Sequence, residues 1–249
     1  GAYHGGWSLG GFAGAGVLLV LLKILSLPVN QSIWGLLIVL FIAMVVVSQF
    51  MLTFGSDPNA KVTKKSKSPL SFHPIALIFG LLSFVSYLVE GAVGDWSALY
   101  LFEDKGIVIE EAVMGVMLFN GTMCIGRLLG NRLGKHLTSK QVVVGGYLLG
   151  SIAMGLIVFL PGHASMYTYL LLGISLAMIV PNLFSAMGEQ NVIPMTQAVA
   201  TSTMLGYMGI LMGPALIGFI AHGTSLTVAF IVLTTLLVVS AGIGKYAYH

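Results

Sequence analysis

Long apolar runs dominate the chain and are separated by shorter polar stretches. Each run has about 20 residues, enough for a helix to cross a hydrocarbon core of roughly 30 Å at 1.5 Å per residue. The pattern therefore predicts an all-α polytopic membrane protein with about eight transmembrane helices, and the short connections between most of them predict antiparallel neighbours. The predicted helices are Gly6–Leu27, Ile33–Phe54, Pro74–Phe102, Ala112–Leu133, Val142–Leu160, Ser165–Met187, Thr196–Ala221 and Leu226–Tyr246.

One polar stretch is longer than the others. Gly55–His73 contains two prolines and four lysines between two apolar runs. Such a composition is typical of a linker. We therefore expect a boundary between a helical group in residues 1–54 and a second group in residues 74–249, with residues 55–73 as the connection.

Composition supports a membrane protein and excludes several classes. Of 249 residues, 57% are hydrophobic and 8% are charged, against about 25% charged in soluble domains. The net charge of +3 arises from loop residues, so we expect no nucleic-acid partner. The single cysteine, Cys124, allows no intramolecular disulfide and no zinc-ligand spacing. The chain opens on Gly1 without a basic n-region or an initiator Met, so we expect truncation or processing and no cleavable signal peptide.

The loop charges predict an orientation, because Lys and Arg accumulate on the cytoplasmic side of a membrane. Nine basic residues fall on one side, against Lys23 and Lys105 on the other. We therefore expect a multi-pass protein of the cell membrane with both ends of this chain in the cytoplasm. The nine are Lys61, Lys64, Lys65, Lys67, Arg127, Arg132, Lys135, Lys140 and Lys245.

Two carboxylates interrupt the apolar stretch that begins at Pro74. Glu90 lies about 24 Å along that helix and Asp95 about 32 Å. An ionised group near a bilayer centre costs roughly 2.5–3.5 kcal/mol, so it usually faces a bundle interior or an aqueous cavity. Glu90 is the candidate for proton coupling or a substrate contact, and a structural hydrogen bond to a neighbouring helix is an equal alternative. Asp95, next to Trp96, is a substrate-pathway candidate or a structural residue of an outer aromatic belt.

Four further residues are candidates for the substrate pathway. Asn120 lies halfway along the fourth helix, where an amide binds a polar solute or a neighbouring helix. In the sixth helix, Pro181 removes a backbone hydrogen bond beside Asn182 and Ser185, so the helix is either kinked or interrupted in a way that offers backbone groups to a ligand. Tyr207, in the seventh helix, lines the same space or packs between helices.

Three helices carry glycines at intervals of about four residues. Such rows let helices approach closely in lipid, where packing contacts hold them together. We expect packing surfaces here, which are compatible with a moving helix interface. The rows are Gly6, Gly10 and Gly14, then Gly126, Gly130 and Gly134, then Gly209, Gly213 and Gly218.

At the end of the fourth helix the chain reads GRLLGNRLGKHLTSKQ, from Gly126 to Gln141. This resembles the loop motif that joins the second and third helices of each half in the major facilitator superfamily. Asn131 stands where that motif usually has an acidic residue, and Asn carries no charge. Arg127 is expected to extend toward the cytoplasmic interface or to join the motif. The matching and flanking residues are Gly126, Arg127, Gly130, Asn131, Arg132, Gly134 and Lys135.

The resemblance covers the whole chain in a shifted frame. Tyr3–Gly16, Glu90–Leu101 and Gly206–Ala221 resemble the fifth, seventh and eleventh helices of bacterial transporters of the fucose permease branch. The resemblance implies that residues 1–54 are the last two helices of an N-terminal half and residues 74–249 a complete six-helix C-terminal half. Four preceding helices of the same protein would then be partners of this chain, together with the lipid bilayer, a small-molecule solute and protons.

The motif inventory points away from enzymes. The sequence has no P-loop, no dinucleotide fingerprint and no HExxH pair, so we expect no catalytic residues, no cofactor and no metal. The leading hypothesis is a secondary active transporter, or a large part of one, that moves a small solute by alternating access with proton coupling. The alternative is a membrane scaffold or sensor that keeps the fold without transport.

Overall fold

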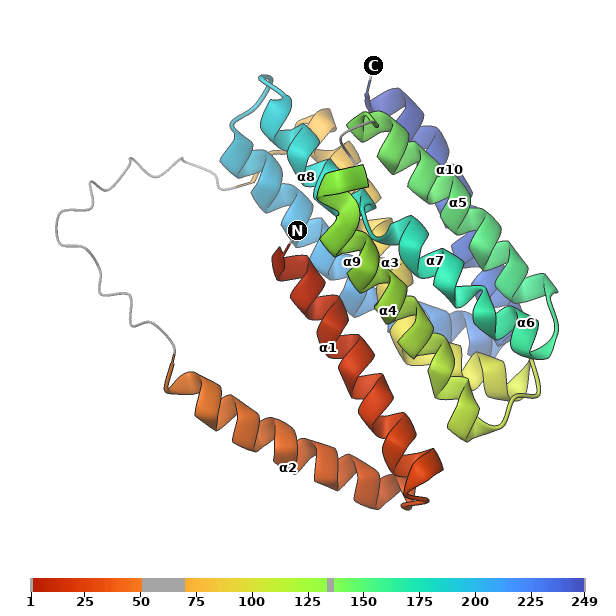
Figure 1. Ribbon diagram of the computed structural model, residues 1–249. Helices are drawn as coiled ribbons and strands as arrows, with labels where there is room; N and C mark the ends of the chain where they lie inside the picture. The colour runs from red at the N-terminus through yellow and green to blue at the C-terminus, as the bar shows by residue number, and fades with distance from the viewer. Residues whose placement is uncertain (1, 51–69, 134–136, 249) are drawn as a thin grey trace.

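A computed structural model describes residues 2–50, 70–133 and 137–248, and every regular element in these ranges is helical (Figure 1). Seven helical segments are long and apolar enough to cross a membrane, and Leu9–Ile24 is a shorter apolar segment. The predicted all-helical membrane fold is thereby confirmed. The elements are α1 (Ala2–Leu19), a π-helical turn η1 (Val20–Ile24), α2 (Val29–Ser48), α3 (Pro74–Glu103), α4 (Ile109–Leu133), α5 (Ser139–Phe159), α6 (Gly162–Tyr167), α7 (Tyr169–Leu176), α8 (Ile179–Glu189), α9 (Met195–Gly223) and α10 (Leu226–Ala247).

Several helices begin earlier than their apolar runs predict, among them the second and the fourth. The second helix, predicted from Ile33, starts at Val29 directly after Pro28, whose carbonyl accepts the first helical bond from Ser32 at 3.0 Å. The fourth helix, predicted from Ala112, starts at Ile109, with two acids in its first turn. Acidic side chains suit the positive end of the helix dipole. Polar first turns are thus helical although they lie outside the apolar run.

Local capping explains several other helix starts. The His73 side chain accepts a hydrogen bond from the Ile75 amide, and Pro74 occupies the first turn of α3, where its missing N–H costs nothing. Thr138 and Gln141 form a reciprocal capping box at α5. The Ser225 side chain caps α10.

Helix α3 lies at the centre of the bundle and packs against α4, α8, α9 and α10 (Figure 1). Its contact with α9 depends on glycines of the third predicted row. A Cβ atom at Gly209 would lie 2.2 Å from the carbonyl oxygen of Phe84, and one at Gly213 would lie 2.7 Å from that of Leu88. The backbones of α3 and α9 therefore approach as closely as glycine allows.

Helix α2 is attached more loosely than the other helices. Helix α1 packs on α4, whereas α2 has α1 and η1 as its main neighbours in the described part of the chain and is exposed along nearly its whole apolar length (Figure 1). The first glycine row differs from the prediction. Gly6, Gly10 and Gly14 have no atom within 4 Å of an added Cβ, and Gly11 makes the close contact with α4 instead.

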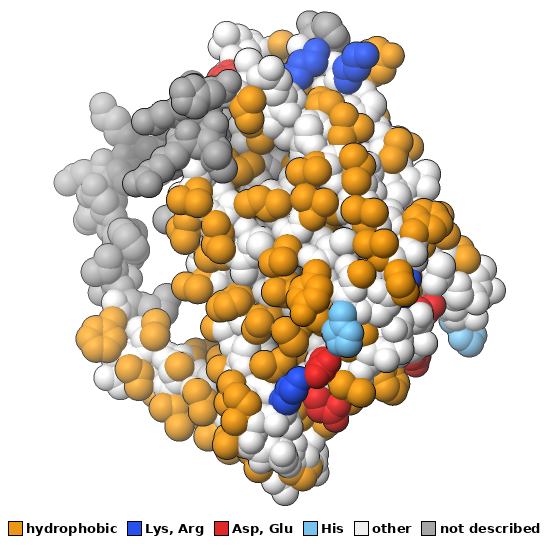
Figure 2. All heavy atoms as spheres, turned by 45° about the vertical axis from the view of Figure 1, so that its right-hand side comes forward, with side chains coloured by type: hydrophobic (Ala, Val, Ile, Leu, Met, Phe, Trp, Pro, Cys, Tyr) orange, Lys and Arg blue, Asp and Glu red, His pale blue; other side chains and the backbone are white. Residues whose placement is uncertain are grey.

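The molecular surface is divided as a membrane protein requires. In Figure 2 hydrophobic side chains cover the middle of the visible face, while charged side chains gather toward its two ends. Exposed apolar side chains in such a band are solvated by lipid tails rather than water. The predicted linker, residues 55–73, lies mostly outside the described residues, so the boundary between two helical groups stays a prediction.

We expect Gly209→Ala to lower the free energy of unfolding by about 1–3 kcal/mol, because the new methyl group forces α9 away from the Phe84 carbonyl. Gly242→Ala on α10 is the matched control. A Cβ at Gly242 meets nothing within 4 Å, so this change should leave stability equal or raise it by up to about 1 kcal/mol through helix propensity. Denaturant titration of the full-length protein in bicelles measures both, and equal stability of the two variants would contradict the packing.

Candidate functional site

A buried ion pair joins the two central helices α3 and α4. Nη2 of Arg127 donates to Oε1 of Glu90 at 2.7 Å, and the two side chains are 1% and 6% exposed. The expectation that Arg127 extends toward the interface is wrong, because its guanidinium lies inside the bundle. A buried charge without a partner is strongly destabilising, and pairing with an opposite charge is the usual remedy within a membrane.

Proline supplies Arg127 with a second partner. Pro181 has no N–H, so the carbonyl of Ala177, four residues earlier, lacks its helical hydrogen bond. Nε of Arg127 donates to this carbonyl at 3.4 Å. The sixth predicted helix is accordingly interrupted at Ala177 and Met178, between α7 and α8. The interruption leaves a free backbone carbonyl, and Arg127 binds it. The sequence alternative, in which backbone groups are offered to a ligand, stays a prediction.

Small residues let α4 approach α7 closely enough for this contact. A Cβ at Gly126 would lie 2.5 Å from the Ala177 side chain, and one at Gly173 would lie 2.2 Å from the Phe119 carbonyl. Gly130 faces the Met178 side chain. The second glycine row is therefore a packing surface at Gly126 and Gly130, while Gly134 lies outside the described residues.

A pocket of about 670 Å³ lies beside the ion pair, between α1, α3, α4 and α9. Its polar side chains are Glu90, Asp95 and Asn120, and the rest of the lining is glycine, alanine and apolar residues. Asn120 Nδ2 donates to the Val116 carbonyl at 3.0 Å. Three of the predicted site residues thus meet at one cavity.

The polar groups that line the pocket are mainly hydrogen-bond acceptors. Among the described residues no hydrogen bond or ion pair engages the exposed carboxylate of Asp95. Pro214, inside α9, leaves the Ile210 carbonyl without its helical partner, and both residues line the pocket. The Pro214 carbonyl is occupied, since Trp96 Nε1 donates to it at 2.9 Å.

The other predicted pathway residues lie away from this pocket. Asn182 Nδ2 donates to the Met178 carbonyl at 2.8 Å, and Ser185 Oγ donates to the Pro181 carbonyl at 3.1 Å, so both make local bonds on α8. Tyr207 on α9 is half exposed and stacks on Tyr87, with ring centroids 6.0 Å apart. None of the three is among the lining residues, and their place in a solute pathway stays a prediction.

The loop motif is described only in part. Gly126, Arg127 and Gly130 belong to the site as set out above. The side chains of Asn131 and Arg132, and the whole of Gly134 and Lys135, lie outside the described part of the structure. The motif's predicted role at the cytoplasmic interface therefore stays a prediction.

The pairing of Glu90 with Arg127 was missed from sequence, although a signal was present. Glu90 lies 13 residues from the end of α3 at Glu103, and Arg127 lies 18 residues from the start of α4 at Ile109, distances of about 20 and 27 Å. These helices are antiparallel neighbours, so the two charges differ in depth by about 7 Å, which a long arginine side chain can span.

Together, the membrane-spanning helices and the pocket, which is open and mostly apolar but contains two carboxylates and an amide, define a polytopic membrane protein with a site large enough for a small solute. No model of a protein family matches the chain. It is 36% identical over 248 residues to an uncharacterised MFS-type transporter of Yersinia pestis, which covers 98% of this chain and 62% of that protein. It is 30% identical over 170 residues to membrane protein MosC of Rhizobium meliloti, which covers 67% of this chain and 42% of that protein.

A solved structure has a similar fold. The Escherichia coli fucose:proton symporter FucP superposes with a TM-score of 0.64 at 16% sequence identity, over 88% of this chain and 56% of that one. The chain thus spans less than two thirds of the length of the relatives it matches. The chain is similar along nearly its whole length to an MFS-type transporter, and it shares the helical fold of FucP.

We expect Arg127→Met to lower the free energy of unfolding by about 3–5 kcal/mol at neutral pH, because it leaves the Glu90 carboxylate buried without a counter-charge. Adding Glu90→Gln should recover a large part of the loss, because the double variant buries no charge. Thermal and denaturant unfolding of four proteins, namely the original, each single variant and the double variant, gives the coupling free energy between Glu90 and Arg127. Strictly additive effects would mean that the two groups do not interact.

Proposed function

We propose that the protein containing this chain is a secondary active transporter that moves a small solute by alternating access and couples this movement to protons at Glu90. One observation carries the proposal: a carboxylate, buried with its arginine partner at membrane depth, lines a pocket large enough for a small solute. Intramembrane ionisable groups beside such cavities are typical of ion and proton pathways.

The pair provides two states for a coupling mechanism. With Glu90 ionised, the carboxylate holds Arg127 and ties α3 to α4. Protonation of Glu90 removes the charge that Arg127 binds, so the contact between the helices weakens. If binding of a solute or a conformational change shifts the protonation equilibrium of Glu90, then protonation of Glu90 shifts that binding or conformational equilibrium by the same coupling free energy.

The lining of the pocket favours one kind of solute. Asp95, Asn120 and the Ile210 carbonyl offer acceptors, and the positive charge of Arg127 is directed to Glu90. We infer a solute that donates hydrogen bonds through hydroxyl or ammonium groups, and poor binding of anions. The lining residues of α1 are three glycines and an alanine, whose small size leaves room for a ring.

The arrangement in the membrane belongs to the same proposal. Residues 1–54 form the last two helices of an N-terminal half, residues 55–73 a cytoplasmic linker, and residues 74–249 the C-terminal half. Four preceding helices of the same protein complete the pocket, and both ends of this chain lie in the cytoplasm of a cell-membrane protein. The loop charges and the partial coverage of the relatives support this arrangement.

A scaffold or sensor without transport is the alternative. It shares the fold but predicts no stabilisation by solutes. A thermal-stability screen of the full-length protein against polyols and amines separates the two, because a solute that binds the native state raises its unfolding temperature.

Glu90→Gln in the full-length protein should reduce proton-coupled uptake or efflux by at least about tenfold, while membrane insertion stays intact. Glutamine keeps the size and a hydrogen bond to Arg127 but cannot take up a proton. Glu103→Gln at the exposed end of α3 is the control and should transport normally. Solute-dependent proton flux into proteoliposomes is the measurement, and unchanged coupling in Glu90→Gln would remove Glu90 from the mechanism.

Asp95→Asn should weaken binding of an ammonium-bearing solute by about tenfold or more, because a hydrogen bond to a charged group is lost. A hydroxyl analogue of the same shape should lose much less. Calorimetric titration of matched amine and alcohol pairs compares the two. Equal losses for both members of a pair would show that the charge of Asp95 does not select the solute.

A further inference from the structure

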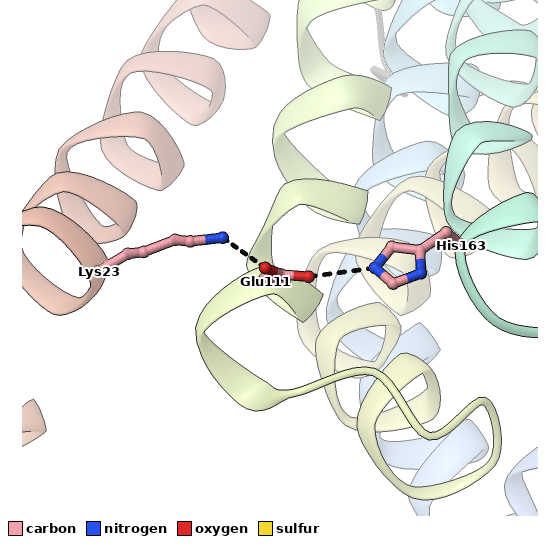
Figure 3. Close-up of polar contacts among 3 residues, drawn as sticks. All are labelled: Lys23, Glu111 and His163. Carbon is pink, nitrogen blue, oxygen red and sulfur yellow. Dashed lines mark hydrogen bonds and ion pairs between the residues drawn. The ribbon is translucent and has the colours of Figure 1, made fainter.

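A second polar cluster lies at one end of α4 (Figure 3), and none of its three residues is among those that line the pocket. Lys23, on η1, forms an ion pair with Glu111 in the first turn of α4. The other carboxylate oxygen of Glu111 lies 3.0 Å from Nε2 of His163 at the start of α6. One carboxylate thus links three helical elements.

The cluster stands at the end of the seam between α1 and α4. Along this seam the side chain of Phe12 faces Gly121, Gly11 faces Asn120, and Gly16 faces the sulfur of Met117. Of the described elements from α3 to α10, α4 is the one against which α1 packs extensively. Whatever moves α1 relative to the six-helix group must therefore open or slide this seam.

We propose that Lys23 and Glu111 form an ionic latch that closes the end of the α1–α4 seam, with His163 holding the carboxylate in position. The inference rests on the proposed transport function, since a latch is needed only if the two helices separate. When the latch is broken, the seam opens from this end toward Asn120 and the pocket.

The strength and the position of the pair suit a reversible contact. Lys23 is 46% exposed and Glu111 is 29% exposed, and exposed ion pairs add little net stability. The pair can therefore break and re-form without unfolding its surroundings. This contrasts with the enclosed pair of Glu90 and Arg127, whose loss exposes buried charge.

The backbone around Lys23 is irregular. Lys23 lies in a π-helical turn, a feature that occurs frequently at functional sites. Three residues later, Ser26 has φ of 51°, which is uncommon for a residue other than glycine. The link between α1 and α2 thus departs from regular helix directly beside the latch.

His163 has the geometry of a positioning residue. It lies on the six-helix side of the seam with Glu111, and its contact is with this carboxylate on α4. Its contact orients the carboxylate from the side opposite to Lys23, as Figure 3 shows. The carboxylate then stays in place on α4 when Lys23 leaves.

The test measures how far the seam is open. Gly16→Cys in a cysteine-free, full-length background in nanodiscs places a thiol on the seam, where an added Cβ meets only the Met117 sulfur at 3.8 Å. We expect Glu111→Gln and Lys23→Met to raise the rate of maleimide labelling about fivefold, the effect of losing one exposed ion pair. Glu110→Gln is the matched control in the same helical turn and should leave the rate unchanged.

Two further variants test the roles of charge and position. Exchanging the charges, with Lys23→Glu and Glu111→Lys together, should return labelling toward the original rate. His163→Ala should raise the rate less than Glu111→Gln does, and His163→Gln, which keeps a hydrogen-bond donor, should restore it. If Glu111→Gln labels no faster than Glu110→Gln, or the exchanged pair stays as open as the single variants, the latch does not exist.

The same experiment separates the latch from transport. A solute that changes the labelling rate of the Gly16→Cys protein supports alternating access. If the latch variants label faster while no solute has any effect, the latch stands and the transport proposal fails. If solutes alter labelling but the latch variants do not, transport stands and the latch is overturned.

Discussion

The ion pair between Glu90 and Arg127 determines how the centre of this protein is built. Neither charge could remain in an apolar interior alone, because the cost of removing it from water is recovered only through a close partner of opposite charge. The requirement fixes the depth of α3 against α4 and brings α7 near α4, since Arg127 also contacts the Ala177 carbonyl. Close glycine contacts at Gly126 and Gly173 then follow, because bulkier residues would hold these helices apart.

Much of the fold could be read from the sequence because lipid imposes simple rules. Helix α3 was predicted from Pro74 to Phe102 and ends one residue later, at Glu103, since a proline and a charged residue bound its apolar run. The start of α4 was missed because Glu110 and Glu111 are polar, although acids belong in a first helical turn. Run length detects the part of a helix in the hydrocarbon and says little about its ends.

The candidate site was predicted less completely. Glu90, Asp95 and Asn120 were selected one by one as polar residues in apolar helices, and the structure brings them to one pocket. Arg127 was assigned to the interface because each helix was considered separately, and its partner lies on another helix. Asn182 and Ser185 bond carbonyls close by in their own chain segment, as short polar side chains often do, and their place in a solute pathway stays a prediction.

Pro181 in α8 affects how the buried Arg127 is stabilised when the charge of its partner Glu90 changes. The carbonyl oxygen that Pro181 leaves free is an acceptor with no protonation equilibrium of its own, so its attraction for Arg127 is the same at every pH. Should Glu90 become neutral, the guanidinium still has the dipole of the Ala177 carbonyl beside it. A missing amide hydrogen on one helix thereby lowers the free-energy cost of neutralising a buried carboxylate on another helix.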